Sequence, residues 1–191
     1  MQAALLLKTE RSTNLLMQSK KKLTIFEMAL FAMYAALMVA SKYAMEILPN
    51  IHLLGMFIVL FTHIYRVKAL IPISIFIGIT GLIAGLDPWW LPYTYIWAVL
   101  WAMAMLIPKN ISKKAAIIVF PIVCSLHGFL YGILYAPAQA IIFGYSIEQT
   151  IAWIVSGIPF DITHGISNFA MGLLIYPLSE VIKKAHKYIY R

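Results

Sequence analysis

The sequence predicts an all-α polytopic membrane protein, a bundle of six transmembrane helices. Of its 191 residues, 62% are hydrophobic and only 12% are charged, whereas soluble domains carry about 25% charged residues. A soluble core would not bury so much apolar surface, so lipid is the expected surrounding. The apolar residues also fall into six segments, and a spanning helix needs roughly 20 mostly apolar residues.

In chain order, the predicted spans are residues 23–48, 51–65, 69–86, 91–107, 115–143 and about 159–182. Residues 1–22 place a short apolar stretch before basic residues, the reverse of a secretory signal, and are predicted to be a cytoplasmic N-terminal segment. The membrane domain is expected over 23–185, with a cytoplasmic tail at 186–191. The second span is short. Residues 144–158 are predicted to form a long outer loop with a short amphipathic piece, ending where Pro159 starts the last helix, because proline suits a first helical turn.

The basic residues predict that both termini are cytoplasmic. Cytoplasmic loops of membrane proteins carry an excess of Lys and Arg. With the N-terminus inside, only Lys42 falls on the outer half, and the rest are cytoplasmic: Lys8, Arg11, Lys20, Lys21, Lys22, Arg66, Lys68, Lys109, Lys113, Lys114, Lys183, Lys184, Lys187 and Arg191. The net charge of +8 is therefore explained by topology, and nucleic acid is not an expected partner.

The first span carries two patterns of four-residue spacing. One is a ridge of small side chains, Ala32, Ala36, Ala40 and Ala44, which allows close helix packing in lipid, either within this chain or onto another membrane protein. The other is Lys42 and Glu46, which fit an i,i+4 pair. As charges near the end of a span, they either face a cavity or reach the outer surface.

The fifth span carries two adjacent rows. Its small residues, Gly128, Gly132, Ala136 and Ala140, predict close packing. Its polar and aromatic residues, His127, Tyr131, Tyr135 and Gln139, form either a buried seam or the wall of an outer pocket.

More polar and aromatic residues gather in the predicted outer third. Asp161, His164 and Asn168 share a face of the last span; an intramembrane aspartate marks a functional site by default, although Asp161 also suits a helix cap. Outer loops and the fourth span add Asn50, His52, Asp87, Trp89, Trp90, Tyr93 and Trp97. This distribution indicates a cup that opens to the outside.

Enzyme motifs do not match. His52, His127, His164 and Asp161 are residue types that bind metals, but their spacing fits no HExxH-type motif, and no GxSxG or Walker sequence occurs. The single cysteine, Cys124, excludes a disulfide within the chain. A small membrane-embedded metal-dependent enzyme and a proton-coupled secondary transporter remain the alternatives, although the latter usually shows inverted repeats.

The whole arrangement, from about Thr24 to Lys184, resembles the substrate-binding S components of energy-coupling factor (ECF) transporters, which import vitamins into bacteria and archaea. The resemblance lies in the size, the six spans, the alanine ridge and the long outer loop before a helix that begins Pro159, Phe160, Asp161. It implies that the ridge docks on a transmembrane coupling subunit, that two cytoplasmic ATPases drive transport, and that a vitamin binds near the outer face. The patterns for riboflavin, thiamine and biotin are not matched.

We therefore expect a vitamin or similar micronutrient to be captured in the cell membrane without covalent chemistry, cofactor or metal. Aromatic rings would stack on the ligand and polar groups would orient it. The predicted substrate-binding residues are Lys42, Glu46, Asn50, His52, Asp87, Trp89, Trp90, Tyr93, Trp97, His127, Tyr131, Tyr135, Gln139, Asp161, His164 and Asn168.

Overall fold

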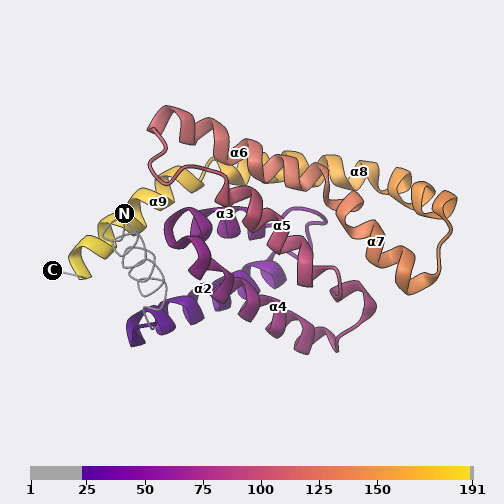
Figure 1. Ribbon diagram of the computed structural model, residues 1–191, viewed down its shortest axis with the longest axis horizontal. Coiled ribbons are helices and arrows are strands. Elements are labelled where there is room, and N and C mark those ends of the chain that lie inside the picture. The colour runs from indigo at the N-terminus through magenta and orange to yellow at the C-terminus, as the bar shows by residue number, and fades with distance from the viewer. Residues whose placement is uncertain (1–22, 190–191) are drawn as a thin grey trace, which may run out of the picture.

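The computed structural model describes residues 23–189, and every regular element in that range is a helix (Figure 1). The all-α prediction is thus confirmed, while the predicted N-terminal segment 1–22 lies outside the described residues. The helices are α2 (Ile25–Ala44), α3 (Leu54–Tyr65), α4 (Leu70–Ala84), α5 (Tyr93–Met105), α6 (Lys113–Phe129), α7 (Tyr131–Phe143), α8 (Ile147–Gly172) and α9 (Ile175–Ile189), with 3-10 turns η1 (Arg66–Ala69) and η2 (Pro88–Trp90).

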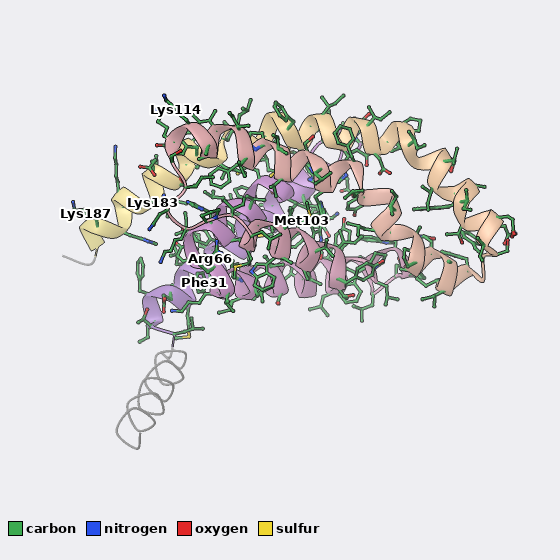
Figure 2. All side chains as sticks on the ribbon, turned by 45° about the horizontal axis from the view of Figure 1, so that its top comes forward. Phe31, Arg66, Met103, Lys114, Lys183 and Lys187 are labelled. Atoms are coloured by element: carbon green, nitrogen blue, oxygen red, sulfur yellow. The ribbon has the colours of Figure 1, made fainter. Side chains whose placement is uncertain are left out.

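One end of the bundle is rich in Lys and Arg, and we call it the basic end. Glu27, at the start of α2, forms an ion pair with Lys68 in η1. Arg66 donates to the carbonyl oxygens of Met105, the last residue of α5, and of Ile107 just beyond it, at 2.5 and 3.0 Å. The basic side chains labelled on this side of Figure 2 are Arg66, Lys114, Lys183 and Lys187.

The opposite end surrounds a cavity. Its lining includes residues from the end of α2, the starts of α3 and α5, the break after α6 and the middle of α8: Lys42, Leu54, Tyr93, Tyr131 and His164. The chain returns to this end after α4, where the Trp89 ring lies 5.5 Å from Lys42 Nζ. The described chain therefore passes six times between the two ends, through α2, α3, α4, α5, α6 and the α8–α9 pair.

By length and composition, three stretches of the described chain qualify as membrane spans: Ile25–Ala44, Leu54–Ala84 and Lys113–Phe143. The pair α8–α9, bent by 41°, would make a fourth. The stretch Leu54–Ala84 contains the reversal at η1, where Arg66 has φ 55°, so it forms two of the six passes. At about 1.5 Å per residue, α3, α4 and α5 are each shorter than the roughly 30 Å apolar core of a bilayer.

The outward faces of the bundle are apolar. Leu82 on α4, Ile118 on α6 and Ile166 on α8 are 76%, 60% and 62% exposed. Large exposed apolar surface is rare on monomeric soluble proteins, and these exposed side chains are compatible with lipid around the helices.

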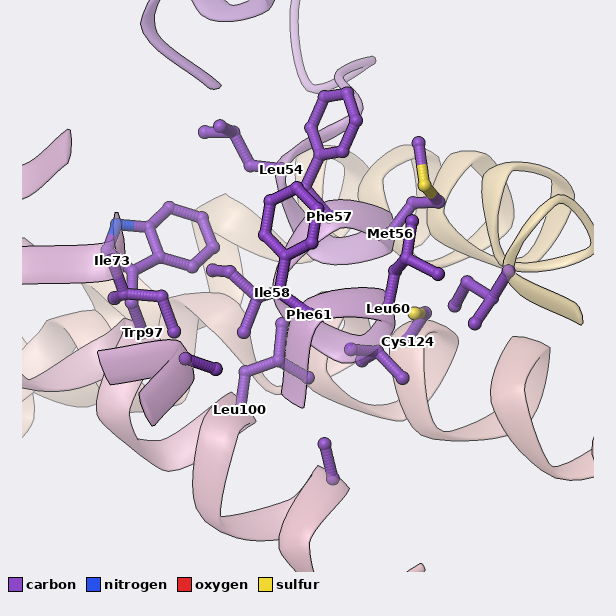
Figure 3. Packing of buried hydrophobic residues seen from close by; sticks show 14 of the residues in the cluster. Leu54, Met56, Phe57, Ile58, Leu60, Phe61, Ile73, Trp97, Leu100 and Cys124 are labelled. Carbon is purple, nitrogen blue, oxygen red and sulfur yellow. The ribbon is translucent and has the colours of Figure 1, made fainter. Parts of the chain in front are cut away.

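Helix α3 is the centre of the core. Every residue from Leu54 to His63 is buried, and α5, α6, α8 and α9 surround it. Figure 3 shows Ile58 and Phe61 of α3 among Trp97 and Leu100 of α5. Cys124 of α6 is also fully buried in this cluster. A helix that is apolar on all sides needs such an enclosure.

Helices α6 and α8 approach each other closely over glycines. A Cβ added to Gly128 would lie 2.8 Å from Gly165 Cα, and one added to Gly172 would lie 2.6 Å from Pro121 Cα. Ala136, further along the predicted small-residue row, is 2% exposed. The packing role predicted for that row is confirmed for Gly128, Gly132 and Ala136, which are buried, while Ala140 is partly exposed.

One boundary was predicted wrongly. Residues 144–158 are not a long loop: α8 begins at Ile147, and Pro159 lies inside it. Ser146 and Gln149 form a capping box that starts the helix there, and Trp153 stacks on Tyr135 of α7. The predicted span 115–143 agrees with the single apolar stretch Lys113–Phe143, although a turn at Leu130 divides this stretch into α6 and α7.

Candidate functional site

The cavity at the end opposite the basic end has a volume of about 190 Å³, and we call it the first cavity. It brings together several side chains that the sequence predicted as ligand contacts: Lys42, Glu46, Asn50, His52, Tyr93, Tyr131 and His164. The loop from Met45 to Leu53, between α2 and α3, supplies much of its wall. Asn50 adopts φ 60° there, a conformation that asparagine tolerates better than most residues.

Two imidazoles form the inner wall of the first cavity. The rings of His52 and His164 meet edge to face with centroids 4.6 Å apart, and Tyr131 contacts His164 at 4.7 Å. Neither ring nitrogen of His164 has a hydrogen-bond partner, nor has Nδ1 of His52. Buried polar atoms are normally paired, so three buried nitrogens without partners set this wall of the cavity apart from the core.

Lys42 and Glu46 both line the first cavity, which is one of the two positions that the sequence left open. The predicted i,i+4 pair between them is absent from the ion pairs of the described chain, because α2 ends at Ala44 and Glu46 lies beyond it. Lys42 Nζ instead lies 4.6 Å from the ring centroid of Tyr43 and 5.5 Å from that of Trp89.

A second cavity, of about 230 Å³, adjoins the first and shares Asn50 and Tyr131 with it. Its lining residues are Asn50, Tyr131, Gly132, Tyr135, Trp153, Gly157, Phe160 and Asp161. The rings of Tyr135 and Trp153 are stacked, with centroids 5.9 Å apart.

Asp161 is the acidic residue of the second cavity. Both of its carboxylate oxygens accept from Gly132 N, at 3.0 and 3.1 Å. Because Gly132 is in the first turn of α7, Asp161 caps α7 and not its own helix. The break between α6 and α7 leaves that N–H without a partner inside the helix, and Asp161 supplies one.

Three predicted contacts lie in the core behind the first cavity. Trp97 is 1% exposed, and its ring lies 6.1 Å from that of His52. His127 Nε2 lies 3.1 Å from the carbonyl oxygen of Ile96. Asn168 Nδ2 donates to the carbonyl oxygen of Cys124 at 3.3 Å. These residues line neither cavity, and they hold α5, α6 and α8 in place behind the first one.

Four further predicted contacts also line neither cavity: Asp87, Trp89, Trp90 and Gln139. Trp90 Nε1 donates to the carbonyl oxygen of Ile77 at 2.8 Å, which fastens η2 to α4. The carbonyl oxygen of Trp89 accepts from the hydroxyl of Tyr135, so this loop is tied to α7 as well.

Three residues that line the second cavity were not predicted from the sequence: Trp153, Gly157 and Phe160. Trp153, Gly157 and Asp161 are spaced by four, so they share a helix face. The loop predicted for residues 144–158 would not place Trp153 and Gly157 on a common face with Asp161. The apolar residues that complete the first cavity were missed because they belong to an irregular segment and the start of α3: Met45, Leu48, Pro49, Ile51 and Leu54.

The alanine ridge faces away from the bundle. Ala32, Ala36, Ala40 and Ala44 are all exposed, while the opposite face of α2 is buried through Phe31, Tyr34, Ala35 and Met38. The ridge therefore does not pack within the described part of this chain, which was one of the two alternatives.

Among residues 23–189, no group of three or more His, Cys, Asp or Glu side chains is placed to hold a metal ion. Comparisons with protein-family models, curated proteins and solved structures found no match to this chain.

Proposed function

We propose that this chain is the substrate-binding subunit of an ECF-type importer and captures a vitamin-like micronutrient at the outer face of a bacterial or archaeal cell membrane. The observation that carries the proposal is the first cavity, where His164 offers two unpartnered ring nitrogens beside Tyr131 and Lys42. Small-molecule sites combine an apolar, aromatic lining with a few polar groups that fix orientation. The chain supplies binding, and partner subunits supply ATP hydrolysis.

Six passes with a basic end support a six-span topology with both termini in the cytoplasm. Cysteine labelling tests this, because the natural Cys124 is fully buried. We expect Ile47→Cys, at a position 90% exposed near the cavity end, to react with a membrane-impermeant maleimide on intact cells. Lys187→Cys, at the basic end, should react only after permeabilisation. The reverse pattern would refute the orientation.

The exposed alanine ridge supports docking onto a transmembrane coupling subunit, since small side chains let helices approach closely in lipid. We expect Ala36→Leu to impair uptake in cells and to leave ligand binding by the isolated chain intact. Ala102→Leu, at an exposed alanine of α5, is the matched control and should affect neither. Loss of binding in Ala36→Leu would contradict a docking role.

Identification of the ligand tests the proposal directly. Mass spectrometry of gently purified chain should find a small organic molecule bound without ATP. A stoichiometric metal and no organic ligand would favour the enzyme alternative. Uptake by the chain alone in proteoliposomes, driven by a proton gradient, would favour the secondary transporter.

A further inference from the structure

The second cavity combines aromatic rings with one carboxylate. Tyr131, Tyr135 and Trp153 contribute rings, and Asp161 contributes the charge. Trp153 stacks on Tyr135 with an interplanar angle of 20°, and both rings line the same cavity as the acid. Aromatic faces attract cations through the ring quadrupole, and Trp does so most strongly.

Asp161 has no ion-pair partner in the described part of the chain, whose ion pairs join Lys68 to Glu27 and Lys183 to Glu180. Its hydrogen bonds come from Gly132 N alone. The start of α7 contributes only about half a positive charge, so the cavity remains net negative. Lys42 lines the first cavity, where it lies against Tyr43 and Trp89, and it does not line the second.

From these observations we infer that the second cavity is a subsite for an organic cation. The volume of about 230 Å³ suits an ammonium group with its substituents or a small cationic ring. A carboxylate among mostly apolar, aromatic side chains binds a cation more strongly than an uncharged molecule of the same shape, because Coulomb attraction grows where water is displaced.

The subsite narrows the class of ligand, and this part of the inference rests on the proposed function. Because the cavities share Asn50 and Tyr131, one molecule can occupy both. Its cationic group would lie between Trp153 and Asp161. Its hydrogen-bonding part would meet the imidazoles of His52 and His164.

The test compares choline with 3,3-dimethylbutan-1-ol, in which carbon replaces the charged nitrogen without a change of shape. Each probe is titrated into the full chain in detergent, and binding is followed by tryptophan fluorescence or by calorimetry. We expect choline to bind roughly tenfold more tightly than the alcohol, given the strength of desolvated cation–π and charge contacts. Equal affinities for the two probes would overturn the inference.

Two variants assign that preference to the cavity. Asp161→Asn keeps an oxygen for Gly132 N and removes the charge, so the preference for choline should disappear. Gly157→Leu should weaken the binding of both probes, because Gly157 lines the cavity and a leucine there would occupy its space. A Cβ at this position meets nothing within 4 Å, so the protein itself should tolerate the change. If Asp161→Asn does not fold, Trp153→Leu replaces it and should reduce the preference. An unchanged preference in a folded Asp161→Asn or Trp153→Leu variant would refute the assignment.

Matched controls are available for both variants. Glu148→Gln removes another carboxylate from α8, and Gly78→Leu fills another helical glycine with nothing within 4 Å. Neither should change binding of either probe. If the native ligand is anionic or uncharged and the chain does not prefer choline to the alcohol, the cation subsite is refuted and the proposed function still stands. Absence of any native ligand together with absence of choline binding would refute both.

Discussion

The contact between α6 and α8 makes a sharp prediction for Gly128→Ala. The added Cβ would lie 2.8 Å from Gly165 Cα and 2.9 Å from both Gly165 N and the carbonyl carbon of His164. All three atoms are backbone, so no side chain can rotate away. Because carbon atoms pack at about 3.5–4.0 Å, the helices must separate by about 0.7 Å or more. We expect unfolding to become easier by about 1–3 kcal/mol, the usual cost of overpacking.

The assay is equilibrium unfolding of the purified chain in mixed detergent, followed by tryptophan fluorescence. Gly78→Ala is the control, because a Cβ on Gly78 of α4 meets nothing within 4 Å and alanine favours the helix. His164 adjoins Gly165, so the displacement should also weaken ligand binding. If Gly128→Ala unfolds at the same detergent composition as Gly78→Ala, the close approach of α6 and α8 is refuted.

Three further changes have defined outcomes. His164→Phe keeps a ring beside Tyr131 but removes two unpartnered nitrogens. Binding of the native ligand should weaken by about 1–3 kcal/mol, while the free energy of unfolding stays the same or rises. If calorimetry finds unchanged affinity, His164 does not contact the ligand. Trp90→Phe deletes the bond to Ile77 and should cost about 1 kcal/mol of unfolding free energy, with no effect on ligand affinity. Lys68→Met breaks a partly exposed ion pair and should cost no more than about 1 kcal/mol in the same unfolding assay; a larger loss would mean that this pair is shielded from water.

Much of the fold followed from local chemistry. The composition predicted a helical protein, and the regular elements of residues 23–189 are helices. Helices α2, α3, α4 and α5 begin within about three residues of the starts predicted for the first four spans. The small row of the fifth span was interpreted correctly, since glycine and alanine at four-residue spacing let backbones touch. Helix class and a small-residue face depend on neighbouring residues alone, so they can be predicted without a tertiary structure.

The start of α8 shows where local reasoning failed. Pro159 was predicted to start a helix because proline in a helix interior costs about 3 kcal/mol. Other contacts can offset that cost. Here the capping box at Ser146 and the stacking of Trp153 on Tyr135 hold the earlier residues in the helix. One of the features on which the resemblance to S components rested, the long outer loop, is therefore absent.

The sequence by itself determined the polar character of the cavity end and the basic character of the other, because charge and hydropathy are read directly from residue types. Only the tertiary structure decided which of those polar residues meet. Lys42, His52 and His164 converge on one cavity, whereas Trp97 and Asn168, of the same predicted set, are buried behind it. The reason is geometric: helix rotation, the end of α2 at Ala44 and the break at Leu130 depend on contacts between distant segments, which no local spacing encodes.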